Sequence, residues 1–92
     1  MRKIETQMLS AIATRSTWRN SNTSVSSIDD VNCAIYLHGN HIADVNSATG
    51  FVMVNKYTLC KWPSNTTKSR LRALGANICT KKGVIYLDNI PV

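Results

Sequence analysis

The chain has 92 residues and a net charge of +6, with 43% hydrophobic and 17% charged residues. This length supports one small hydrophobic core, so it excludes a large multi-substrate enzyme and indicates a single domain over residues 1–92. The composition is that of a globular protein and excludes a disordered chain. No apolar run approaches the roughly 18 residues that a membrane span requires, and we expect no membrane partner.

The basic charge is confined to one part of the chain. Residues 1–55 contain four basic and four acidic residues, whereas residues 56–92 contain seven basic residues and one acidic residue, Asp88. A one-sided basic segment attracts polyanions, which include nucleic acids and acidic proteins. The same charge is also typical of a solvated surface that keeps a protein soluble, and the sequence leaves both interpretations open.

An N-terminal helix is expected over residues 3–15, because Ile4, Met8 and Ile12 recur at helical spacing. The basic start of the chain is similar to that of a signal peptide. However, Glu5 interrupts the apolar run that would have to follow. We therefore expect a cytoplasmic protein.

Residues 16–27 are rich in Ser, Thr and Asn, which predicts a connection rather than a core element. Trp18 is expected to pin this connection to the core. Residues 23–27 can form a short edge strand. An exposed edge strand would allow a homodimer through strand pairing.

An antiparallel β-meander is expected next. Val31, Cys33, Ile35 and Leu37 recur at every second position and so share one face, which is the pattern of a half-buried strand. Turn residues at 39–40 and 46–50 predict two further strands, the last beginning at 51–54 and extending through 57–60. Strands with such short connections are antiparallel, because parallel neighbours need a crossover of a dozen or more residues.

A short basic helix and a C-terminal β-hairpin complete the predicted α+β fold. Pro63 and Gly75 delimit a helix over residues 66–74. The segments 77–80 and 84–87 are predicted strands, and the loop that joins them, 81–83, carries two lysines.

The outer face of this helix and the hairpin loop form the candidate nucleic-acid site. Winged helical DNA-binding proteins present a recognition helix and a β-hairpin in this way, with donors to phosphate on both. A helix-turn-helix, however, needs a second helix directly before the recognition helix, where this sequence predicts strands. On the helical wheel Arg70 lies on the flank and the other polar candidates point outward. The candidate residues are Lys68, Ser69, Arg70, Arg72, Lys81 and Lys82.

His38 and His41 flank a turn and would face each other across the ladder if the loop between them had two residues. A two-residue loop, however, places the apolar Ile35 opposite the charged Asp44, whereas a three-residue loop places Ile35 opposite Ala43. The spacing offers no third ligand. A polar hairpin tip is therefore favoured over a metal site.

Cys33, Cys60 and Cys79 are widely spaced, which argues against a zinc site and a disulfide framework. Cys33 and Cys79 lie in apolar stretches and are expected to be buried free thiols. No base or orienting carboxylate is evident beside Cys60 or the hydroxyl residues at 64–67. The sequence therefore predicts no catalytic residue, no metal and no cofactor, and the protein is not expected to be an enzyme.

Three segments of the chain resemble small proteins encoded by short-tailed bacteriophages. They are residues 1–5 (MRKIE), 36–43 (YLHGNHIA) and 62–75 (WPSNTTKSRLRALG). The resemblance implies a phage accessory protein made in the cytoplasm of a bacterial host. Such proteins act by binding host machinery or nucleic acid, and the resemblance brings no active site.

Two binding functions are therefore expected. The first is binding to the nucleic-acid phosphate backbone through residues 66–74 and 81–83. The alternative is an inhibitor or adaptor that binds an acidic host protein, with Trp18, Tyr57 and Trp62 as anchors. In so small a domain these three aromatic side chains are more often buried in the core.

Overall fold

The computed structural model describes residues 2–92, which form three helices and two antiparallel sheets. The predicted α+β fold is confirmed. The larger sheet has the strand order β1-β2-β3-β4-β5, and the smaller one has the order β6-β7-β8. In chain order the elements are α1 (Lys3–Ala13), β1 (Trp18–Asn20), β2 (Thr23–Ser27), β3 (Asn32–Leu37), β4 (Asn40–Asn46), β5 (Val52–Val54), α2 (Lys56–Lys61), α3 (Asn65–Ala73), β6 (Ile78–Lys81), β7 (Val84–Leu87) and β8 (Ile90–Pro91).

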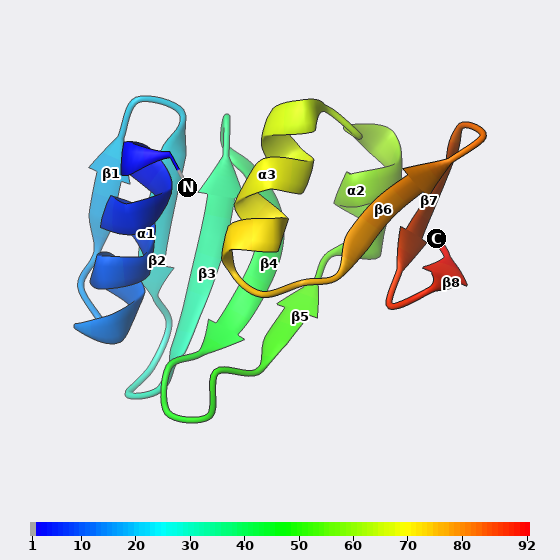
Figure 1. Cartoon of the computed structure of the whole chain (residues 1–92). Coiled ribbons are helices and arrows are strands. Elements are labelled where there is room, and N and C mark those ends of the chain that lie inside the picture. The colour runs from blue at the N-terminus through cyan, green and yellow to red at the C-terminus, as the bar shows by residue number, and fades with distance from the viewer. Residues whose placement is uncertain (1) are drawn as a thin grey trace.

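Helices cover one face of the larger sheet. Figure 1 shows α1 in front of β1 and β2, and α3 in front of β3 and β4, while the smaller sheet lies at the opposite end of the molecule from α1. One buried apolar cluster joins these parts and includes Met8 in α1, Ile35 in β3, Leu59 in α2, Leu71 in α3 and Ile78 in β6. Within residues 2–92, no helix is both long and apolar enough to cross a membrane.

The alternation along β3 determines which face of the sheet is buried. Cys33, Ile35 and Leu37 are all buried, as the sequence predicts. Cys33 pairs with Val45 and Ile35 pairs with Ala43 on β4, and these partners are buried as well. Residues that share a face of a sheet recur at every second position. The apolar pattern of β3 therefore favours the register in which its buried residues lie opposite buried residues of β4.

The turn between β3 and β4 differs from both predicted loops. It consists of His38 and Gly39, which have φ values of 52° and 79°. Two consecutive positive φ values are typical of a type I′ hairpin turn. The register then shifts beside Ile35, so that Ile35 still pairs with Ala43. This irregularity leaves Ile42 and Ala43 both buried, because a bulge adds one residue to one strand of the pair.

The segment predicted to extend the last meander strand is a helix. β5 ends at Val54, and the Asn55 side chain caps α2 by accepting a hydrogen bond from the Thr58 N–H at 3.2 Å. Thr58 and Leu59 then face the core. The strand prediction for 57–60 is wrong because a short mixed run fits either period, and the side-chain cap favours the helix.

β2 is an interior strand and not the predicted edge strand. It pairs with β1 on one side and with β3 on the other, so both rows of its backbone hydrogen-bonding groups are used. A homodimer through β2 therefore has no exposed edge to use. The edges of this sheet are β1 and β5. Trp18 lies in β1 and packs against the core, as expected.

Candidate nucleic-acid interface

α3 is fixed by a side-chain cap at its start and by a buried face along its length. Ser64 Oγ accepts a hydrogen bond from the Thr67 N–H at 3.1 Å, and the two hydroxyl oxygens lie 2.9 Å apart. Thr67 and Leu71 are buried and form the inner face of the helix. The cap accounts for the hydroxyl groups at the start of this helix.

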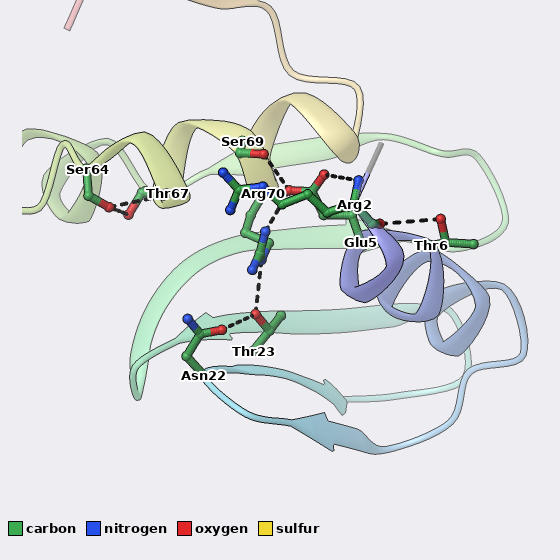
Figure 2. A network of polar contacts seen from close by, with 9 residues as sticks. All are labelled: Arg2, Glu5, Thr6, Asn22, Thr23, Ser64, Thr67, Ser69 and Arg70. Carbon is green, nitrogen blue, oxygen red and sulfur yellow. Dashed lines mark hydrogen bonds and ion pairs between the residues drawn. The ribbon is translucent and has the colours of Figure 1, made fainter.

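Arg70 and Ser69, two of the predicted contact residues, point into the protein. Figure 2 shows the Arg70 side chain extending from α3 toward the sheet, with Glu5 of α1 beside it and Thr23 of β2 at its end. Arg70 Nη1 donates to Glu5 Oε2 at 2.7 Å, and its Nε donates to Thr23 Oγ1 at 3.0 Å. The Ser69 hydroxyl donates to the same Glu5 oxygen.

The expected outward position of Ser69 is therefore wrong, and Arg70, expected on the flank of the helix, is buried. Arg70 is only 3% exposed and Ser69 is half-buried. The physical reason is Glu5, which is itself 3% exposed. A buried carboxylate needs donors and a counter-charge, and α3 supplies both.

The pKa of Glu5 reflects these opposing influences. Burial is the largest of them and raises the pKa, because it disfavours the charged form. The hydrogen bonds from Ser69, Arg70 and the Arg2 N–H, together with the Arg70 charge, outweigh burial and hold the pKa below its ordinary value. Glu5 is thus ionised at neutral pH. Because its carboxylate pairs with Arg70 in the interior, Arg70 does not contribute to the positive charge of the surface.

Two other predicted residues connect α3 to the C-terminal hairpin. Lys68 Nζ donates to Thr80 Oγ1 at 2.8 Å. Arg72 Nε donates to the backbone carbonyl of Ile78 at 3.0 Å. Thr80 and Ile78 both belong to β6, so these two hydrogen bonds join the helix to the first strand of the hairpin. Arg72 is exposed, and Lys68 is partly exposed.

The last two predicted residues lie at the tip of the hairpin. Lys82 is exposed and adopts a φ of 51°, and Gly83 follows at 78°, which again makes a type I′ turn. Lys81 is exposed on the face of the hairpin opposite to Thr80, with its Nζ 5.9 Å from the centroid of the Tyr86 ring. We call Lys68, Arg72, Lys81 and Lys82 the basic surface.

Two exposed aromatic side chains beside this helix contradict the expected core burial. Tyr57 in α2 is 73% exposed, and Trp62 directly after α2 is 51% exposed. Lys61 lies over both rings, with its Nζ 5.6 Å from the Tyr57 centroid and 5.9 Å from the Trp62 centroid. The position of Trp62 before Pro63, in the connection between two helices, is the sequence signal for its exposure.

The two histidines take different roles. His38 is exposed in the β3–β4 turn, and His41 Nε2 lies 2.7 Å from Asp44 Oδ1. The His41–Asp44 pair lies within β4, and the exposed His38 makes the tip of the hairpin polar, as the sequence favours. Among the residues that the structure describes, no group of three His, Cys, Asp or Glu side chains is placed to hold a metal ion.

All three cysteines are free thiols. Cys33 is buried as predicted, and burial, with a smaller effect of the Asp29 charge, raises the pKa of its thiol. Cys79 is only partly buried, because it lies on the opposite face of β6 from the buried Ile78. Cys60 is exposed.

The model of one protein family, described as Kyanoviridae Gp96 protein, matches residues 1–91. The chain belongs to this family. The match to the Gp96 family covers every element from α1 to β8, including the basic surface and the exposed aromatic residues. It confirms a bacteriophage protein. The narrower expectation of short-tailed phages is not supported, because the Kyanoviridae are cyanophages of the myovirus type. No curated protein and no solved structure matches the chain.

Proposed function

We propose that this chain is a non-enzymatic phage protein of the host bacterial cytoplasm that binds the phosphate backbone of nucleic acid through its basic surface. The observation that carries the proposal is the hydrogen bonding of Lys68 and Arg72 to β6. These contacts hold α3, which carries Lys68 and Arg72, against the hairpin that carries Lys81 and Lys82. Donors on a helix and on a neighbouring hairpin suit a backbone whose phosphates are spaced along a strand.

The distribution of charge supports the same proposal. Of the seven basic residues in 56–92, only Arg70 takes part in an ion pair within the described residues. From residue 56 to residue 87 the sequence contains no acidic residue. The positive charge at this end of the molecule is therefore not offset by neighbours in the chain, which favours a polyanionic partner.

Binding is expected to weaken steeply with salt. If four cations contact phosphates, raising the salt concentration fourfold lowers the affinity about 100-fold, because each contact releases condensed counterions. Fluorescence anisotropy with labelled single strands and duplexes of DNA and RNA, over a salt series, measures this dependence. Affinity that does not change with salt, or no binding at low salt, contradicts the proposal.

A triple variant localises the contacts. Lys68→Gln/Arg72→Gln/Lys82→Asn removes three charges, and Asn tolerates the positive φ of residue 82. We expect it to lower the salt slope by about 3. Arg70 is left unchanged because its loss would disturb folding.

The matched control variant is Lys3→Gln/Arg19→Gln/Arg15→Asn. It removes the same charge from α1, β1 and the turn between them, and Arg15 also has a positive φ, 54°. We expect the control to bind like the wild type. Equal losses in both variants would mean that net charge, and not the basic surface, determines binding.

A second candidate function is an inhibitor or adaptor of a host bacterial protein. It is favoured by three apolar side chains that lie 59–64% exposed around a hollow of about 340 Å³, namely Ile28, Phe51 and Met53. Exposed apolar clusters of this kind are typical of protein-binding surfaces. The expected result is a stoichiometric partner recovered from nuclease-treated bacterial lysate by the wild type and lost with Phe51→Ser/Met53→Ser. Recovery of no such partner contradicts this function.

A further inference from the structure

An open pocket of about 720 Å³ lies where the connection between α2 and α3 faces the β3–β4 turn. Leu37, Trp62 and Pro63 give it apolar walls, and Asn40 and Lys61 add polar groups. Its volume lies within the roughly 300–1,000 Å³ range of pockets that hold small ligands. It can therefore hold a single planar group, but it is too small for a double helix.

An exposed aromatic side chain lines the pocket. Trp62, which lines it, is 51% exposed, and the neighbouring Tyr57 is 73% exposed. The Lys61 ammonium lies over both rings, 5.6 Å from the Tyr57 centroid and 5.9 Å from the Trp62 centroid. An aromatic ring beside a cation is the arrangement by which proteins stack bases of single strands and hold the adjoining phosphates.

The charge around the pocket favours an anionic occupant. Of the residues within 2–92 that line it, none is Asp or Glu. Lys61 is part of the wall, and Lys68 follows directly after Thr67, which also lines the pocket. α3 thus carries both part of the pocket wall, at Thr66 and Thr67, and the first cation of the basic surface, Lys68. A strand whose phosphates follow that surface can place a base in the pocket.

We propose that this pocket binds one unpaired base of a single-stranded nucleic acid, stacked on Trp62, with the flanking phosphates held by Lys61 and Lys68. This proposal rests on the proposed function and adds the strandedness of the ligand. Bases within a duplex are paired and stacked on one another, so only an unpaired base can enter such a pocket. Stacking on an aromatic face is tolerant of sequence.

The test uses full-length protein with Trp18→Phe, so that Trp62 is the single tryptophan. The probes are oligothymidylate, an abasic strand of the same length and a duplex of the same length. Oligothymidylate is expected to quench the Trp62 fluorescence. Trp62→Ala is expected to weaken its binding roughly 5- to 150-fold, the range measured for loss of one stacked base. The abasic strand and the duplex should bind Trp62→Ala and the parent protein equally.

Trp62→Phe is the matched control, because it keeps an aromatic face and should retain most of the oligothymidylate affinity. Circular dichroism confirms that each variant is folded, as expected for an exposed side chain. If Trp62→Ala binds oligothymidylate like the parent, or loses the abasic strand equally, the pocket proposal is overturned while phosphate binding by the basic surface stands. If none of the three probes binds at low salt, both proposals are overturned.

Discussion

Arg70→Ala is expected to lower the free energy of unfolding by about 3–5 kcal/mol. The substitution leaves Glu5 ionised at a site where its side chain is only 4% exposed. It also removes the hydrogen bond to Thr23 that links α3 to β2. Because domains of this size are stable by only about 5–15 kcal/mol, this is a large share of the total. Urea unfolding followed by circular dichroism measures the change.

Arg72→Ala is the matched control, since it removes the same side chain two residues further along α3. Arg72 is exposed and donates one hydrogen bond to a backbone carbonyl, so we expect a loss of about 1 kcal/mol. Equal losses for the two substitutions would contradict the importance of the buried pair.

A double replacement separates the cost of an unpaired charge from the value of the pair. Glu5→Met/Arg70→Met removes both charges and fills the space with apolar atoms. The double variant is expected to be more stable than Arg70→Ala, because apolar replacement of a whole buried ion pair is often neutral or stabilising. A double variant less stable than the single one would mean that the ion pair itself contributes most of the energy.

The elements predicted correctly are those in which the spacing of apolar residues fits only one type of secondary structure. Met8 and Ile12 at helical spacing place α1, and the alternation over 32–37 places β3 and its buried face. The segment at 56–61 fits either period. Its helical form depends on the Asn55 cap and on packing against β4, which local periodicity does not encode.

The ion pair of the candidate site could not be predicted from the position of Arg70, because its partner Glu5 lies 65 residues away in the sequence. A local signal for the partner does exist. Glu5 lies three residues before Met8 and seven before Ile12, so it belongs to the apolar stripe of α1. A carboxylate on a buried stripe requires donors from another element, and this requirement is what turns Arg70 inward.

The ion pair also changes the interpretation of the net charge. A helix with three basic residues in five positions suggests a fully basic face, yet the central one, Arg70, neutralises an acid of α1. The cations left on α3, Lys68 and Arg72, are those that contact the hairpin. Arg70 is therefore unavailable to nucleic acid, whereas Lys68 and Arg72 point toward the hairpin, which is the second element of the proposed interface.

Acid is expected to destabilise the protein through Glu5. The folded-state pKa of Glu5 lies below its ordinary value. The stabilisation is therefore complete above the pKa of the unfolded chain, about 4.3. It is lost as the pH falls from there through the folded-state pKa, because the unfolded chain takes up the proton first. Each unit by which the pKa is lowered contributes about 1.4 kcal/mol.

Glu5→Gln identifies this contribution in urea unfolding at a series of pH values. At pH 7 the variant is expected to be less stable than the wild type, because Arg70 stays buried without its counter-charge. The difference should shrink as the pH falls below about 4.3, since the wild type then loses the same charge. A residual decline in both proteins is expected from Asp29, whose pKa is lowered by hydrogen bonds from the Asn32 side chain and from backbone N–H groups. A difference that stays constant down to acid pH would show that the charge of Glu5 does not stabilise the fold.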